Sequence, residues 1–370
     1  MVTSLKIDEK KMGNRGSKSV VVSNVIIVKE QRVDGSWGLN KSLRCTLSGF
    51  ERNYQVKIPS KQLNKFYSTI SESQKILNPD FITGFTDAEG CFKVSIYKAE
   101  NFKTGWCVRS VFEIGLNNRD ILLLLKIQEF FGGIGIINPD KTNDTVKYSV
   151  NSLNDITTII IPHFKKYKLI TQKAADFILF EKIVKLMNKR AHLTITGIQH
   201  IINIKASMNL GLNDVIKSEF SEIKPAKREI IQTTNIPDPH WISGFASGEG
   251  NFDPGIKKQD NCKTGFQVYL RFRVSQHERD TRLMELLIKY FGIGRVENTR
   301  QVTTFVVSNF SDLTKIIIPF FKKYPILGIK QLDFIDWCKI ANLMSTRSHL
   351  KQEGLEKIRL IKDGMNTGRK

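Results

Sequence analysis

The sequence predicts an α+β protein made of two pseudo-symmetric half-domains, each a curved antiparallel four-stranded sheet with helices on one face, joined through two packed helices. Three observations support this prediction. A motif occurs twice, as Pro79–Gly90 and again as Pro239–Gly250. Each copy is followed by strand-like alternation of apolar and polar residues, and each half closes with long helical patterns. Paired strands with helices on one face are typical of the α+β class.

The repeat extends well beyond the motif in one collinear register. The matched segments are Arg119-Asp120 with Arg279-Asp280, Phe131-Gly132 with Phe291-Gly292 and, after a three-residue deletion, Phe164–Tyr167 with Phe321–Tyr324. A match over so long a stretch indicates an internal duplication. We expect an N-terminal extension (1–75), a first half (76–217), a linker (218–235) and a second half (236–370). Such a chain is a pseudo-dimer and is expected to be a monomer.

Each half is expected to run helix, two strands, helix, two strands, helices. Asn78 and Asp238 are good N-caps for the opening helices, and a proline follows each at the first helical position. The later elements are expected as strands at Trp106–Leu116 and Phe266–Gln276, helices at Ile121–Phe131 and Thr281–Phe291, and strands at Ile134–Ile137, Thr145–Val150, Arg295–Glu297 and Thr303–Ser308.

The first 70 residues have no counterpart in the second half. Met1–Val20 is polar and is expected to be disordered, so the extension would be partly disordered. Short strands are expected at Val21–Val28, Leu43–Leu47 and Tyr54–Ile58. The sequence assigns this segment no function.

The chain carries 57 Lys and Arg against 36 Asp and Glu, a formal net charge of +21. A polyanion would neutralise this excess, and nucleic acid is the commonest such partner. A membrane surface is disfavoured because no polybasic block stands out; a soluble protein with a basic bias is the plain alternative. No apolar run is long enough to cross a bilayer. The five cysteines form no CxxC pair, which disfavours a disulfide framework and a zinc module.

The repeated motif places an acidic residue at the same position of each copy. Gly84 and Ala88 lie one helical turn apart, and the second copy has glycine at both positions, so two helix backbones could approach closely. Glu89 and Glu249 would then meet at the helix ends, where two charges about 4 Å apart repel by about 4 kcal/mol at an effective dielectric near 20. A divalent cation such as Mg²⁺ would relieve this repulsion. The plain alternative, an exposed glutamate at a helix end, is disfavoured by the duplication.

The motif copies read ITGFTDAEG at Ile82–Gly90 and ISGFASGEG at Ile242–Gly250. They resemble the signature helices of a double-motif LAGLIDADG homing endonuclease, over residues 78–366. The resemblance implies a metal-dependent DNA endonuclease that serves intron homing and makes a staggered double-strand break by phosphodiester hydrolysis. It implies that Glu89 and Glu249 are catalytic and bind metal, and that the carbonyl groups of Ala88 and Gly248 contribute to the metal sites.

Two lysines, Lys173 and Lys330, stand at matching positions ahead of closing helices. The resemblance implies a catalytic basic residue in this region, which would orient water or stabilise charge on the phosphate. The alternative is a solvated lysine in the first turn of a helix. Asp87 is matched by Ser247 and so cannot belong to a symmetric ligand pair; we expect it to form local hydrogen bonds.

The polar face of each sheet is the predicted DNA-reading surface, because alternate side chains on a concave face can reach base edges and phosphates. The candidates are Lys93, Ser95, Tyr97, Arg109, Glu113, Lys147 and Ser149 in the first half, and Gln267, Tyr269, Arg271, Arg273, Ser275, Arg295 and Glu297 in the second. The alternative is a merely solvated face. Matched positions differ, as Arg109 and Tyr269 do, so an asymmetric target is expected.

Two other functions compete with DNA cleavage. The resemblance implies, for some members, an RNA maturase that assists splicing of its own group I intron, and a DNA binder without cleavage is the third possibility. The presence of both Glu89 and Glu249 favours cleavage of double-stranded DNA. Abundant Ile, Lys and Asn, together with the resemblance to intron-encoded proteins of fungal organelles, predict a location in the mitochondrion. The acidic residues near the N-terminus are unlike a transit peptide.

Overall fold

The computed structural model describes residues 46–47, 50–51, 77–140 and 143–369. Two compact units, Met1–Gln74 and Lys75–Lys370, make up the chain. In the first unit, β1 (Thr46–Leu47) pairs antiparallel with β2 (Phe50–Glu51), at the end of the predicted strand Leu43–Leu47. Three further predictions lie outside the described residues: strands at Val21–Val28 and Tyr54–Ile58, and disorder over Met1–Val20.

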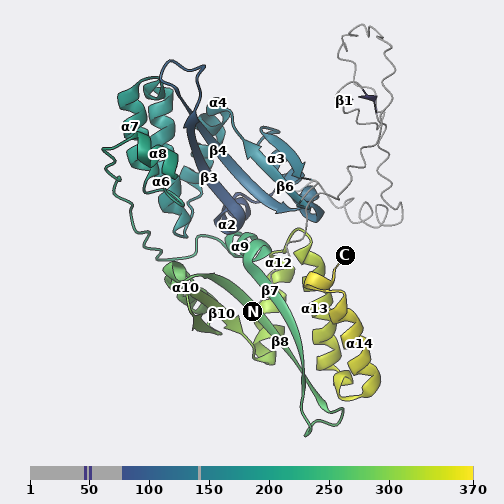
Figure 1. Cartoon of the computed structure of the whole chain (residues 1–370). Helices are drawn as coiled ribbons and strands as arrows, with labels where there is room; N and C mark the ends of the chain where they lie inside the picture. The colour runs from purple at the N-terminus through teal and green to yellow at the C-terminus, as the bar shows by residue number, and fades with distance from the viewer. Residues whose placement is uncertain (1–45, 48–49, 52–76, 141–142, 370) are drawn as a thin grey trace, which may run out of the picture. The chain divides into compact units, whose positions relative to one another are not determined.

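The second unit consists of two halves whose helices and strands follow the same order, except that the first half ends with an additional helix, α8 (Figure 1). The first half contains α2 (Pro79–Glu89), β3 (Gly90–Lys98), β4 (Trp106–Asn117), α3 (Ile121–Phe130), β5 (Ile136–Asp140), β6 (Thr145–Val150), α4 (Leu153–Asp155), α5 (Ile161–Lys166), α6 (Lys173–Asn188), α7 (Ile195–Lys205) and α8 (Asp214–Glu219). The second contains α9 (Pro239–Glu249), β7 (Gly250–Lys258), β8 (Phe266–His277), α10 (Thr281–Phe291), β9 (Arg295–Thr299), β10 (Val302–Val307), α11 (Phe310–Asp312), α12 (Ile318–Lys323), α13 (Lys330–Ser345) and α14 (Gln352–Asp363). Short 3₁₀ turns precede α3 and α10.

Each half is built on a four-stranded antiparallel sheet. The strand orders are β3-β4-β6-β5 and β7-β8-β10-β9, so the two sheets have the same topology. Helices cover one face of each sheet, with α6 beside β3 and α13 beside β7 (Figure 1). The predicted α+β architecture with two similar halves is therefore confirmed. Among the helices that the structure describes, none has the length and apolar character that a bilayer span requires.

The ends of several elements follow the predicted capping chemistry. The side chain of Asn78 accepts hydrogen bonds from the first backbone N–H groups of α2, and Asp238 does the same for α9. The strand expected at Ile134–Ile137 instead runs over Ile136–Asp140. Gly135 has a φ of +76°, a left-handed conformation that does not fit a strand, so pairing begins only after it.

Each half has its own hydrophobic core beneath its sheet. In the first, the Phe92 ring lies 5.1–5.4 Å from four other rings; these belong to Phe112, Phe164, Phe177 and Phe180. Phe252 holds the same place in the second half; its neighbours at 5.1–5.7 Å are Phe272, Phe321, Phe334 and Trp337. The duplication has therefore preserved the core around one central ring, where each aromatic pair adds about 0.5–1.5 kcal/mol beyond its buried area.

The segment that connects the halves is hydrogen-bonded to the first half between Lys224 and Thr233. Residues 220–238 form no helix or strand. Arg228 pairs with Asp176 on α6, and the backbone of Ile231 exchanges two hydrogen bonds with the side chain of Gln172. These bonds satisfy backbone groups that lie outside regular structure, so the segment that connects the halves is held in place.

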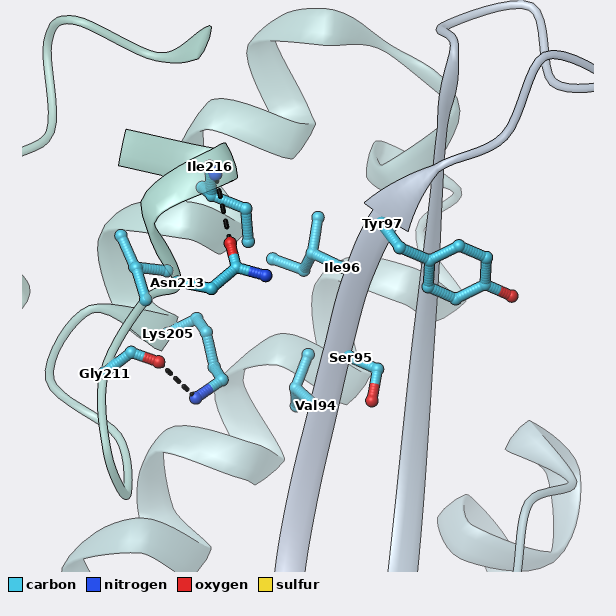
Figure 2. A pocket seen from close by; sticks show the side chains of 9 residues that line it. Val94, Ser95, Ile96, Tyr97, Lys205, Gly211, Asn213 and Ile216 are labelled. Carbon is cyan, nitrogen blue, oxygen red and sulfur yellow. Dashed lines mark hydrogen bonds between the residues drawn. The ribbon is translucent and has the colours of Figure 1, made fainter. Parts of the chain in front are cut away.

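A cavity of about 260 Å³ lies between β3 and the loop that leads into α8. Figure 2 shows Val94 and Ile96 facing the α8 side, whereas the ring of Tyr97 points away from it. Lys205 closes the loop by donating a hydrogen bond to the carbonyl of Gly211. The alternation along β3 therefore separates an apolar face, which packs on helices, from a polar face, which carries Tyr97.

Candidate active site and nucleic-acid interface

The two motif helices, α2 and α9, pack at the distance of backbone contact. A Cβ built on Gly84 would overlap the carbonyl of Trp241, and a Cβ built on Gly244 would overlap the carbonyl of Phe81. At the ends of the helices, a Cβ on Gly248 would overlap the methyl group of Ala88. The predicted close approach through small residues is confirmed, and it leaves no room for a side chain at these glycines.

Aromatic rings anchor both motif helices. Phe81 and Phe85 stack at 6.1 Å on α2, and Trp241 and Phe245 stack at 4.8 Å on α9. All four side chains are buried. Their burial offsets the loss of conformational freedom at the joint and fixes the rotation of each helix about its axis.

Asp87 does form hydrogen bonds, but the prediction that these bonds are local is wrong. Its carboxylate is fully buried and accepts from the backbone N–H of Ile170 (3.0 Å), the hydroxyl of Thr171 (2.6 Å) and the indole N–H of Trp241 (2.9 Å). The Trp241 donor comes from the second half. Local spacing could not predict these partners, because tertiary packing brings them together. At the matching position, the hydroxyl of Ser247 accepts from the N–H of Leu327 (3.0 Å).

Glu89 and Glu249 lie close together at the adjoining C-terminal ends of α2 and α9. A Cβ built on Gly248 would stand 3.1 Å from Oε1 of Glu89. Burial, followed by the negative charge of Glu89, raises the pKa of Glu249 to about 7. Burial also raises the pKa of Glu89, against the opposing effect of nearby lysines. The structure therefore brings the two acids into one partly buried centre, where burial destabilises the ionised form of each carboxyl group.

Lys173 and Lys330 reach the same centre from the first residues of α6 and α13. The ammonium group of Lys173 donates to the carbonyls of Thr86 (2.8 Å) and Ala88 (3.1 Å). That of Lys330 donates to the carbonyl of Gly248. Burial lowers the pKa of both lysines, while the surrounding carboxylates oppose this change. Neither lysine is simply solvated.

The centre offers a set of hard oxygen donors, which suits Mg²⁺ or Ca²⁺ rather than zinc. These donors are the carboxylates of Glu89 and Glu249 and the carbonyls of Ala88 and Gly248. Each carbonyl oxygen has two lone pairs, so a hydrogen bond from a lysine leaves one lone pair for another partner. In the described part of the chain, no three His, Cys, Asp or Glu side chains form a metal-binding group. A cation here would therefore need carbonyl and water ligands as well as the two acids.

Gln276 belongs to the same centre, and the sequence reasoning did not identify it. Its amide donates to Oε1 of Glu249 (2.8 Å). The matching position of the first half holds Leu116, so the two acids have different surroundings. A signal was present in the sequence, because Gln276 is polar yet shares the parity of the core-facing Val274 on β8.

In the first half, the DNA-binding candidates lie on the sheet face opposite the core, as expected from parity. Arg109 stacks over the ring of Tyr97 at 5.5 Å, and Lys147 lies 3.9 Å from Glu113. Lys93 and Ser95 alternate with core residues along β3. Ser149 differs from the others, because it is only 8% exposed and offers little surface to a ligand.

In the second half, several side chains of the corresponding face form ion pairs with one another. Asp253 on β7 pairs with Arg271 (2.8 Å) and Arg273 (3.2 Å), and Arg271 stacks over Tyr269 at 4.9 Å. The sequence reasoning missed Asp253, although its position matches Lys93. The other candidates on this face are Gln267, which is exposed, Ser275, which bonds to Thr304 (2.9 Å), and Arg295, which pairs with Glu297.

The fold and this centre define an internally duplicated α+β protein whose acids and lysines converge where the two repeats meet. The LAGLIDADG endonuclease family profile matches the chain twice, at residues 82–184 and 242–341, once in each half. The chain belongs to this family.

Several known proteins are similar to the chain. "Probable intron-encoded endonuclease 3" of Neurospora crassa is 46% identical over 97% of this chain and 71% of its own length. "Probable intron-encoded endonuclease 2" of the same organism is 38% identical over 78% of this chain and 65% of its own length. The solved structure of the I-SmaMI LAGLIDADG homing endonuclease bound to cleaved DNA has a TM-score of 0.78 and 44% identity, covering 80% of this chain and 98% of that one. The structure of I-GzeII with its DNA target has a TM-score of 0.74 and 43% identity, covering 80% and 100%.

Proposed function

We propose that this protein is a site-specific DNA endonuclease that makes a staggered double-strand break at a long, asymmetric target by metal-assisted hydrolysis. The observation that carries the proposal is the convergence of Glu89, Glu249, Lys173 and Lys330 where two similar halves meet. Relatives named as intron-encoded endonucleases and similar structures bound to DNA support it. None of these names points to RNA, so DNA cleavage is favoured over the maturase alternative.

Two acids and two lysines at one pseudo-symmetric centre would serve one scissile phosphate on each strand. Glu89 and Glu249 would hold divalent cations, with the carbonyls of Ala88 and Gly248 as further ligands. The ammonium groups of Lys173 and Lys330 would donate hydrogen bonds to phosphate oxygens and stabilise the negative charge that grows in the transition state. Their partial burial strengthens this interaction, because the charges are poorly screened by water.

We propose Mg²⁺ as the cation, because the donors are carboxylate and carbonyl oxygens. When bound, a divalent cation supplies an activated water and stabilises the leaving oxygen. The I-SmaMI protein has been solved with an uncleaved DNA target in the presence of calcium ions. Calcium shares the preference for oxygen ligands, so it is a useful cation for binding measurements on the present chain.

The polar faces of the two sheets would bind DNA in adjacent stretches of the major groove. Arg109 and Arg271 each stack on a tyrosine ring, so these side chains would lose less conformational freedom on binding DNA. The excess of 21 positive charges would release counterions from the DNA, so binding should weaken steeply with salt. Different residues at matched positions of the two sheets support an asymmetric target.

We also propose that the chain acts as a monomer in the mitochondrion, with an extension (1–75), halves at 76–217 and 236–370, and a linker (218–235). A relative from Podospora anserina, 37% identical over 45% of this chain, is described as a protein in ND4 intron 1. Intron-encoded relatives of this kind support an organellar origin. Mapping the reading frame to an intron of an organellar gene would test it.

The experiment uses a DNA fragment in which the exons that flank the reading frame are joined. With Mg²⁺, the purified protein should cut this fragment at one place and leave staggered ends. Glu89→Gln and Glu249→Gln should each keep DNA binding and lose double-strand cleavage. Glu285→Gln, at an exposed position of α10, is the matched control and should cut like the wild type.

Two results would overturn the proposal. One is a wild-type protein that binds the fragment yet cuts neither strand with Mg²⁺ or Mn²⁺. The other is cleavage that persists in both Glu89→Gln and Glu249→Gln. Assistance of intron splicing by a protein that nicks no DNA would support the RNA maturase instead.

A further inference from the structure

Two aspartates at matching positions, Asp120 and Asp280, each bind the opposite half. Oδ1 of Asp120, in the first half, accepts from the backbone N–H of Ile329 (2.6 Å) in the second half. Oδ1 of Asp280, in the second half, accepts from the backbone N–H of Gln172 (2.8 Å) in the first half. The two contacts are reciprocal, and both follow the pseudo-symmetry of the duplication.

The side chains of these aspartates do not cap the helices that they begin. Asp120 and Asp280 are the N-cap residues of α3 and α10, a position where an aspartate side chain usually accepts from its own helix. Neither does so here. The N-cap residues of α6 and α13 are Gln172 and Ile329, and neither caps its own helix with its side chain. Each long helix therefore receives its carboxylate partner from the other half.

The receiving helices begin with the two lysines of the centre. Lys173 follows Gln172, and Lys330 follows Ile329, so each lysine is the first residue of its helix. A positive charge at a helix N-terminus opposes the helix dipole, and a carboxylate at the same end offsets this cost. Asp280 is 5% exposed, so its bond to the Gln172 N–H is little weakened by water.

The local packing is built around the Asp120 contact. Gly328 has a φ of +75°, and a Cβ at this position would run into Oδ1 of Asp120. The matching residue of the first half is Thr171, whose hydroxyl and N–H are taken by Asp87. The absence of a side chain at Gly328 thus allows the carboxylate of the first half to reach the second.

We propose that Asp120 and Asp280 are reciprocal positioning residues, which fix the start of α13 and of α6 and thereby aim Lys330 and Lys173 at the cleavage centre. Each lysine is then correctly placed only when the opposite half is docked. This inference rests on the proposed endonuclease function, since it assigns the lysines to the cleaved phosphates.

The test measures the cleavage of each DNA strand separately, with the two strands carrying different labels, at saturating protein and Mg²⁺. Lys330→Ala and Lys173→Ala first establish which strand depends more on which lysine. Asp120→Ala should slow the strand that Lys330→Ala slows most, by about 10-fold, and Asp280→Ala should slow the other by a similar factor. The affinity for DNA, measured with Ca²⁺, should stay within about 3-fold of wild type.

Two further variants separate positioning from general stability. Asp120→Asn keeps an oxygen acceptor for the Ile329 N–H and should recover most of the rate that Asp120→Ala loses. The double variant Asp120→Ala with Lys330→Ala should be no slower than Lys330→Ala alone, whereas Asp120→Ala with Lys173→Ala should combine both losses. Asp363→Ala, exposed at the end of α14, is the control.

The outcomes are distinguishable. The inference is overturned if Asp120→Ala and Asp280→Ala cut both DNA strands at the rates of Asp363→Ala. It is also overturned if either variant slows the DNA strand that depends on the other lysine. Unfolding of both alanine variants at the assay temperature would assign the pair to stability and would also overturn it. A wild-type protein that cuts no DNA would overturn the proposed function, and this inference with it.

Discussion

Replacing Glu249 by glutamine is expected to stabilise the metal-free protein even though it removes cleavage. Glu249 lies partly buried beside Glu89, and burial and this neighbouring charge raise its pKa to about 7 from an ordinary value of 4.5. Glutamine has nearly the same shape and carries no charge. The substitution should therefore remove an electrostatic cost without opening a cavity.

The size of the effect follows from proton linkage. The folded state binds a proton at Glu249 more tightly than the unfolded state does, so the free energy of unfolding falls as the pH rises from about 4.5 to about 7. A pKa difference of about 2.5 units corresponds to about 3 kcal/mol once both states are ionised, near pH 8. At pH 5 most of this cost is absent, and about 1 kcal/mol remains. For a unit of this size, about 3 kcal/mol raises Tm by about 6 °C.

The assay is urea unfolding in the presence of EDTA at pH 5 and pH 8. Glu249→Gln should exceed the wild type in stability at pH 8, and the gain should shrink at pH 5. Glu285→Gln, with an exposed side chain, should show no such dependence on pH. An equal gain at both pH values, or none at pH 8, would refute the reasoning. Added Mg²⁺ should stabilise the wild type more than Glu249→Gln, because only the wild type retains both acids.

Three other predictions follow from the same structure. Gly244→Val should destabilise the protein by about 3 kcal/mol or more in urea unfolding, because the valine side chain would meet the backbone of α2. Gly115→Ala is the control and should be tolerated, since the nearest neighbouring atom is 3.7 Å from the added Cβ; equal stabilities of the two variants would contradict this. Arg109→Ala should weaken DNA binding and lower the slope of log affinity against log salt by about 1, as measured by fluorescence anisotropy; an unchanged slope would argue against a phosphate contact. Removal of divalent cations by EDTA should abolish cleavage and leave DNA binding detectable in a gel-shift assay, so cleavage in EDTA would exclude the metal-assisted mechanism.

The fold was predictable from the sequence because local signals and the duplication agree. Caps at Asn78 and Asp238, and period-two alternation on β8, fix the elements, and each half supports the assignment of the other. The disagreements are small and local. The strand expected to begin at Ile134 begins at Ile136 because Gly135 adopts a conformation that periodicity does not reveal.

At the candidate site, the sequence predicted the polar residues that occur in both repeats, which include the two glutamates and the two lysines. It missed Gln276, which has no polar counterpart, and it missed the reach of Asp120 and Asp280 into the opposite half. It also assigned the bonds of Asp87 to local partners. These contacts depend on how the halves dock, which no spacing within one half encodes. Repeats identify candidates for a shared centre, but only packing shows which half supplies each partner.

The buried carboxylate of Asp87 makes the two halves non-interchangeable. Its indole donor is Trp241, and the first half has Phe81 at the matching position, which has no hydrogen-bond donor. In a pair of two first halves, Phe81 would stand where Trp241 stands, so the carboxylate of each Asp87 would lack this donor. The joint therefore depends on an acid from one half and an indole from the other, and the two copies cannot be exchanged at this position without losing the bond.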